Sequence, residues 1–168
     1  RPIKALSDQQ LSDLRAGQGM GLALAAELNG YPGPSHVLEL ADQLGLSSEQ
    51  RSKVEEMFAA MKAETTSIGD RLIEEESNLD RQFAHRIVSP ESLRSATTGI
   101  SNAQGELREA HLKYHLLTTP LLDKDQLEKY PGCAVTQSRP PRNSSIITDR
   151  RRALNKNREI AAPKGRWP

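Results

Sequence analysis

Residues 47–117 set the architecture of this chain and have the sequence SSEQRSKVEEMFAAMKAETTSIGDRLIEEESNLDRQFAHRIVSPESLRSATTGISNAQGELREAHLKYHLL. Apolar side chains recur there at spacings of mostly three and four, first over 54–87 and then over 93–117. This alternation predicts two helices, each with one narrow apolar stripe that suits a helix–helix seam. The first stripe contains Val54, Phe58, Met61, Thr65, Ile68, Leu72, Leu79, Phe83 and Ile87, and the second contains Leu93, Ala96, Ile100, Ala103, Leu107, Ala110, Tyr114 and Leu117.

The ends of both helices carry local signals. Ser47 and Gln50 have the spacing of a capping box, in which each side chain bonds the backbone N–H of the other residue. Ser89 followed by Pro90 predicts an N-cap with proline at the first helical position. We therefore expect a long helix from Ser48 to about Ile87, folded back at Ser89 and Pro90 onto a second helix.

The composition is compatible with such a hairpin. Of the 168 residues, 36% are hydrophobic and 4% aromatic, which is low for a rounded core but enough for two helices with solvated faces. No apolar run approaches the roughly 18 residues of a membrane span. The single cysteine, Cys133, excludes an internal disulfide framework and a multi-cysteine zinc site.

The formal net charge of +1 hides an acidic body and a basic tail. Residues 131–168 hold nine Lys or Arg and two Asp or Glu. Residues 1–130 therefore hold 14 Lys or Arg and 20 Asp or Glu. The tail has no sustained apolar period and is predicted to be disordered. It differs so sharply from what precedes it that a shifted reading frame or a fused, non-native segment is one interpretation. Nucleic-acid binding is not expected, because no aromatic stacking array accompanies the charge.

Short segments flank the hairpin. A helix is predicted to begin near Ser7 and another at Ser35. A last short helix, 122–130, has Asp123 as N-cap and Gln126 at the capping-box position and is expected to stop at Pro131. The glycines of residues 17–21 indicate a flexible linker rather than a nucleotide loop, because no strand precedes them and no Lys-Ser/Thr pair follows.

Two short motifs resemble a known family. Residues 46–50, Leu-Ser-Ser-Glu-Gln, and residues 122–126, Leu-Asp-Lys-Asp-Gln, both resemble the Leu-Thr-x-x-Gln motif that occurs twice in the Spy/CpxP family of periplasmic proteins. Both depart at the threonine, and both replacements can still cap a helix. Residues 19–38 are similar to a branch described as Spy/CpxP-type chaperones or periplasmic heavy-metal sensors.

The resemblance covers roughly residues 3–130 and implies an all-α, hooked antiparallel long hairpin with short flanking helices. It also implies a periplasmic, envelope-stress protein that forms a homodimer, exported by a leader upstream of Arg1. The expected organisation is an N-terminal extension with short helices over 1–34, a hairpin domain over 35–130, and the disordered basic tail over 131–168.

Candidate metal ligands lie on the second long helix. His111 and His115 are four residues apart, so both imidazoles project from one face at the margin of the apolar stripe. Folding back at Ser89 predicts that His115 lies near Glu64, a candidate third ligand. His36 is expected to reach Glu55 or Glu56. The metal-sensing relatives use His, Glu and a sulfur or nitrogen donor from these helices, which makes His36, His111 and His115 the matching candidates and Met61 a weaker one.

The alternative for the histidines is an ordinary, partly exposed and hydrogen-bonded role at the stripe margin. No catalytic constellation is visible in the sequence, so an enzyme is not expected. Three functions remain open: an ATP-independent chaperone that binds unfolded envelope proteins; a sensor or resistance protein that binds Zn, Cu, Ni or Co and acts on a membrane-bound signalling partner; and a coiled-coil adaptor. Neither of the first two requires another cofactor.

Overall fold

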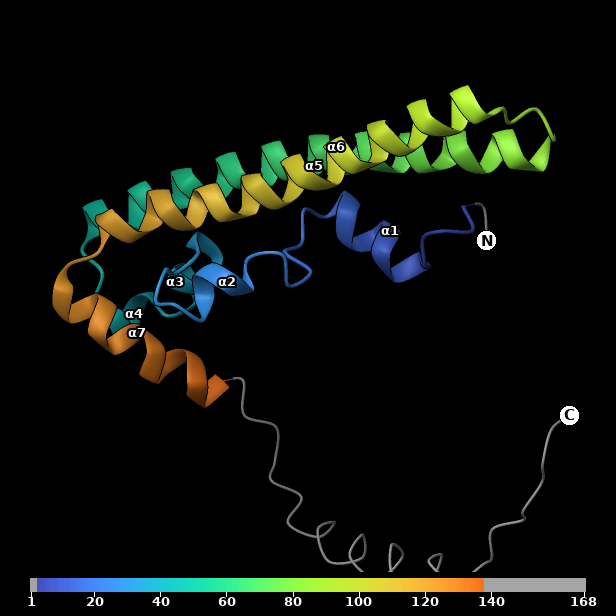
Figure 1. The fold of residues 1–168 in the computed structure, drawn as a ribbon. Helices are drawn as coiled ribbons and strands as arrows, with labels where there is room; N and C mark the ends of the chain where they lie inside the picture. Colours follow the sequence, from blue (N-terminus) through green and yellow to red (C-terminus); the bar gives the residue numbers. More distant parts are fainter. Residues whose placement is uncertain (1–2, 138–168) are drawn as a thin grey trace, which may run out of the picture. The chain divides into compact units, whose positions relative to one another are not determined.

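The computed structural model describes residues 3–137, with side chains described through Tyr130, and every regular element in that range is helical (Figure 1). The predicted all-α class and its two long helices are confirmed. No helix in the described range is long and apolar enough to cross a membrane. The elements are α1 (Asp8–Arg15), α2 (Leu24–Glu27), α3 (Pro34–Glu39), α4 (Ala41–Leu44), α5 (Ser48–Ala84), α6 (Pro90–Thr118), the 3-10 helix η1 (Thr119–Leu121) and α7 (Lys124–Gln137).

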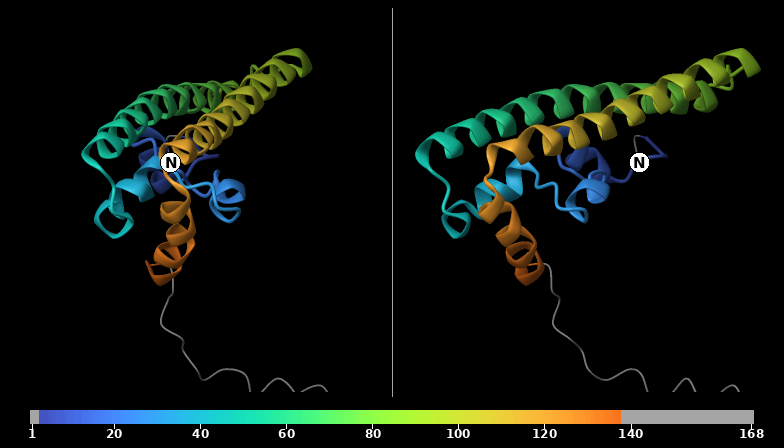
Figure 2. Two further views of the ribbon diagram at one scale, coloured as in Figure 1. Left: turned by 90° about the vertical axis from the view of Figure 1, so that its left-hand side faces the viewer. Right: turned by 60° about the vertical axis from the view of Figure 1, so that its left-hand side comes forward.

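Helices α5 and α6 run side by side in opposite directions, and small residues let them approach closely (Figures 1 and 2). Ala96, Ala103 and Ala110 are buried along α6. A Cβ atom on Gly99 would lie 2.8 Å from a carboxylate oxygen of Glu75, so α5 packs directly on this glycine. The seam therefore combines the predicted apolar stripes with small residues on α6.

The predicted caps form. The Ser47 hydroxyl accepts from the Gln50 N–H at 3.1 Å, and the Gln50 side chain accepts from the Ser47 N–H at 3.0 Å. Ser89 caps α6, with Pro90 in its first turn. Helix α5 ends at Ala84, three residues earlier than expected, because Arg86 adopts the left-handed conformation with φ of 56°. That conformation stops the helix.

The two motif glutamines meet. The Asp123 carboxylate caps the Gln126 N–H at 2.9 Å, as predicted for the start of α7. Gln50 Nε2 donates to Gln126 Oε1 at 2.8 Å, and Gln126 Nε2 donates to Gln50 Oε1 at 3.0 Å. Two capping boxes separated by 76 residues are thereby joined, which fixes the start of α7 against the start of α5.

The N-terminal segment belongs to the same core as the hairpin. The described chain up to Thr136 forms one compact unit. Helix α1 approaches α5 closely at Gly69, since a Cβ there would lie 2.7 Å from the Leu14 carbonyl oxygen of α1. The N-terminal segment and the two long helices share one cluster of buried hydrophobic residues, which comprises Ile3, Leu6, Leu11, Leu14, Leu72, Ile100, Ala103 and Leu107.

A second hydrophobic cluster lies at the end of the hairpin where α5 begins, and there α3 and α4 meet α5 and α7. Gly45 supplies the left-handed C-cap of α4, with φ of 65°. The cluster comprises Val37, Leu40, Leu44, Val54, Leu122 and Tyr130. We call this end, with the segments packed on it, the hairpin base.

The prediction that α7 stops at Pro131 is wrong, because the helix continues to Gln137. A proline inside a helix removes one N–H donor, and the turn on either side can still be helical. The first seven residues of the predicted disordered tail are therefore helical, and residues 138–168 lie outside the described range.

Candidate functional site

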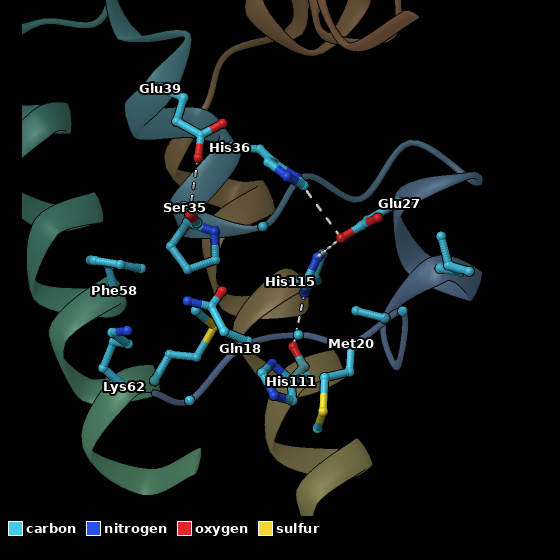
Figure 3. Close-up of a pocket in the computed structure, with 18 residues that line it drawn as sticks. Gln18, Met20, Glu27, Ser35, His36, Glu39, Phe58, Lys62, His111 and His115 are labelled. Atoms are coloured by element: carbon cyan, nitrogen blue, oxygen red, sulfur yellow. Dashed lines mark hydrogen bonds and ion pairs between the residues drawn. The ribbon is translucent and has the colours of Figure 1, made fainter. Parts of the chain in front are cut away.

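A cavity of about 530 Å³ opens between the two long helices and the segment that packs on them (Figure 3). Helix α6 contributes His111 and His115, and α5 contributes Phe58, Met61 and Lys62. The remaining wall comes from the N-terminal segment and from α3. Those residues are Gly17, Gln18, Gly19, Met20, Gly21, Ala23, Leu24, Glu27, Gly33, Pro34, Ser35, His36 and Glu39.

Both histidines of α6 are buried, at 2% exposure for His111 and 4% for His115. The partly exposed position given as the alternative for these histidines is therefore wrong for both. The sequence spacing placed the imidazoles on one face correctly, but it carried no information about the N-terminal segment that covers this face. The Nε2 atoms of both rings are buried without a hydrogen-bond partner.

A hydrogen bond determines the proton position on a neutral His115. Its Nδ1 lies 2.8 Å from the carbonyl oxygen of His111. Because a carbonyl can only accept, Nδ1 carries the hydrogen and Nε2 presents a lone pair. That Nε2 lies 3.4 Å from Glu27 Oε1, and His36 Nδ1 lies 3.9 Å from the same oxygen (Figure 3). Two acceptors face each other at His115 and Glu27 unless a proton or another cation lies between them.

Burial favours the neutral form of His111. Burial lowers its pKa below the ordinary value, the neighbouring His115 lowers it further, and a hydrogen bond with the Gln18 backbone partly opposes both effects. A buried neutral imidazole keeps one nitrogen available as an acceptor or ligand.

Glycine lets the chain approach these rings. A Cβ on Gly33 would lie 2.5 Å from His115 Nε2, so only glycine fits between α3 and this imidazole. Gly17, at φ of 60°, packs against the Thr65 side chain, where a Cβ would lie 2.8 Å from Oγ1. Residues 17–21 therefore line the cavity, and Gly17 packs on α5. That these residues form a flexible linker stays a prediction.

Glu64 does not join the histidines. Its carboxylate accepts from Lys113 Nζ at 2.6 and 2.7 Å and from the Tyr114 hydroxyl at 2.8 Å. These hydrogen bonds, Lys113 first, lower the pKa of Glu64. The expected proximity of His115 to Glu64 is not observed, because the His115 ring points into the cavity toward Glu27.

His36 also has a different neighbour from the one expected. It lies beside Glu27 rather than Glu55 or Glu56. Glu27 was not identified from the sequence, since it lies on a different segment from the histidines and no spacing rule connects them. Within residues 3–137, no three His, Cys, Asp or Glu side chains are arranged to hold a metal ion as they stand.

Known proteins supply no further guide to this site. No family model, curated protein or solved structure matches the chain. The cavity combines the two buried imidazoles of α6 with the imidazole of His36 and the carboxylates of Glu27 and Glu39.

Proposed function

We propose that this protein is a Spy/CpxP-like envelope-stress protein with a hooked helical hairpin that binds exposed apolar segments of unfolded clients without ATP. The observation that carries this proposal is the exposed apolar rim beside the cavity. Met20 and Leu24 line the cavity, and Leu24 is 50% exposed. Leu28, 80% exposed, and the exposed Tyr31 follow within four residues of the end of α2. Exposed apolar side chains gathered beside a cavity are typical of a binding surface.

The side chains of the cavity favour weak, adaptable contacts. The exposed Met20 and the buried Met61 both line it, and methionine side chains adjust to differently shaped partners. Lys62 lies over the Phe58 ring, with Nζ 5.9 Å from its centroid. A client side chain entering the cavity would therefore meet both apolar and charged groups, which permits binding without a unique sequence.

The test is suppression of client aggregation, followed by light scattering at stoichiometric protein. We expect the wild type to reduce scattering, and Leu24→Ser/Leu28→Ser to lose most of that effect. The matched control is Leu116→Ser/Leu117→Ser, which removes two exposed leucines from α6 outside the cavity lining. No suppression by the wild type, or equal loss in both variants, would contradict a rim-specific client site.

A second function is favoured by His115 and Glu27. Two ligand atoms on a tetrahedral ion with bonds of about 2.0–2.1 Å lie about 3.4 Å apart. This equals the observed separation of His115 Nε2 from Glu27 Oε1. We propose on this basis that the pair can bind a divalent ion such as zinc, copper, nickel or cobalt. His36 would be the third ligand after a side-chain rotation, because its imidazole is about half exposed. The buried Nε2 of His111 is a further candidate donor.

Calorimetry with zinc, nickel, cobalt and copper tests the metal proposal. We expect binding in the wild type and a large loss in His115→Ala and Glu27→Gln. His85→Ala is the control, because His85 is exposed and lies outside the cavity. Glu64→Gln is a second control, since Glu64 is bound to Lys113. Equal heats in His115→Ala and the wild type would remove the site.

The proposed location and partners rest on the resemblance to the Spy/CpxP family. The protein would act in the periplasm as a homodimer, on unfolded envelope proteins or, with a metal bound, on a membrane-bound signalling partner. Sedimentation velocity of the full chain tests the dimer, and a single monomeric species across the micromolar range would contradict it.

A further inference from the structure

The hairpin tip, residues 81–94, is the end of the hairpin away from the cavity. It comprises the last turn of α5, the connection and the first turn of α6 (Figure 1). It begins just beyond Asp80, which pairs with Lys4 of the N-terminal segment at 2.9 Å. The two helices project past that segment (Figures 1 and 2).

Three large apolar side chains are exposed within these fourteen residues. Ile87 is 69%, Phe83 55% and Leu93 38% exposed. They extend the two apolar stripes of the hairpin seam, but at the tip the described segments do not cover them. Exposed apolar side chains at one end of an element mark a contact surface.

The tip also carries a net positive charge, whereas the rest of residues 1–130 carries a net negative charge. It holds Arg81, Arg86 and Arg94 with a single acid, Glu91, which gives +2. Residues 1–130 have 14 basic and 20 acidic residues, so the part outside the tip carries −8. All three arginines are exposed. The charge of the tip therefore has the opposite sign to its surroundings.

Arg86 occupies a position that normally favours glycine. Its φ of 56° is left-handed, and it ends α5 through a bond from the Ile87 N–H to the Gln82 carbonyl at 3.0 Å. An arginine is strained there, whereas Gly45 fills the corresponding left-handed position at the end of α4. Arg86 is exposed there, so its guanidinium contributes to the positive charge of the tip.

We propose that the hairpin tip binds a phospholipid surface that carries anionic headgroups. Arginine side chains contact phosphate while their aliphatic stems and the apolar side chains enter the interface. A tip built from the ends of two helices suits a flat surface, whereas a protein partner would have to provide an acidic hollow. With three arginines and three apolar side chains the association is weak and salt-dependent. It is independent of the client and metal sites, which lie at the hairpin base.

The experiment must separate the tip from the basic tail, because residues 131–168 would also be attracted to anionic lipid. The full chain with Cys133→Ser receives an environment-sensitive fluorophore at Ala84→Cys, an exposed position on the last turn of α5. The matched control carries the same label at Ala60→Cys, an exposed alanine in the middle of the same helix. Vesicles contain either phosphatidylcholine alone or an added third of phosphatidylglycerol.

The expected result is a blue shift of the fluorophore's emission at Ala84→Cys with anionic vesicles only, and no shift at Ala60→Cys. Salt at about 0.5 M should reverse the shift, because it screens the attraction between the arginines and the anionic headgroups. Arg86→Gly should weaken partitioning about fivefold while the protein stays folded. Ile87→Ser should weaken it, and Leu116→Ser should not.

Several outcomes would overturn the proposal. Co-sedimentation with vesicles without a shift at Ala84→Cys would mean that the tail alone binds. An equal shift with neutral vesicles would remove the role of the arginines. A shift with polyglutamate but not with vesicles would assign the tip to an acidic protein instead.

Discussion

The two ends of the hairpin share the same pair of helices but differ in what covers them. At the base, α3, α4, α7 and the N-terminal segment pack on α5 and α6, and they enclose Leu44, Val54 and two histidines. At the tip, comparable apolar positions such as Ile87 remain exposed. The same stripe thus becomes a core where a third segment lies across it and a contact surface where none of the described segments does.

The largest difference is expected for one substitution made at both ends. Leu44 is buried at the base, whereas Leu93 at the tip is more than one-third exposed. Leu44→Ala should lower the free energy of unfolding by about 2–5 kcal/mol, because it leaves a cavity. Leu93→Ala should lower it by less than about 1 kcal/mol. Urea unfolding measures both, and similar losses would mean that the tip is covered in solution.

Glycine substitutions in the long helices sharpen the comparison of covered and open faces. Gly69→Ala would place a Cβ 2.7 Å from the Leu14 backbone oxygen, and we expect a loss of about 1–3 kcal/mol. Gly105→Ala points into open space, and we expect a gain of about 0.5–1 kcal/mol from helix propensity. Thermal unfolding distinguishes the two, and a gain in both would contradict the close packing of α1 on α5.

Arg86→Gly should stabilise the protein. Relief of the left-handed conformation is worth about 1 kcal/mol for a non-glycine residue. Urea unfolding checks this gain, with Arg94→Gly as a control that should destabilise α6 because it lies inside a helix. A loss of stability in Arg86→Gly would show that the arginine side chain stabilises the tip.

The smallest expected effect is a pH dependence that arises at the base. Burial lowers the pKa of His111 in the folded protein, so the unfolded chain binds a proton more readily. Stability from this group is therefore present above its ordinary pKa of about 6.5 and declines as the pH falls below it. Urea unfolding of the chelator-treated protein at pH 7.5 and 5.5 should show a larger decrease for wild type than for His111→Gln. The exposed His85 provides the control, because His85→Gln should retain the wild-type difference.

Local sequence patterns predicted much of the fold. The capping boxes at Ser47 and Asp123 depend on contacts three residues apart, and both were identified correctly. The end of α5 was misplaced because Arg86 adopts a conformation that its residue type does not favour. The continuation of α7 past Pro131 was missed because a proline usually ends a helix but can be accommodated within one.

The candidate site was predictable only in part. His111 and His115 were placed on one face by their spacing, but Glu27 comes from a segment more than eighty residues away in the chain. The expected register along the hairpin predicts Glu64 as a third ligand. In the structure its carboxylate accepts hydrogen bonds from Lys113 and Tyr114 instead. A register estimate locates a residue along a helix but does not determine which way a neighbouring side chain points.

The identity of each residue and its near neighbours was enough to define helices, caps and stripes, because those features arise from interactions within one or two helical turns. Burial of the two imidazoles, the pairing of Gln50 with Gln126, and the meeting of Glu27 with His115 required distant segments to pack together. Those contacts arise from the combined shape of several surfaces, and no short spacing in the chain encodes that shape.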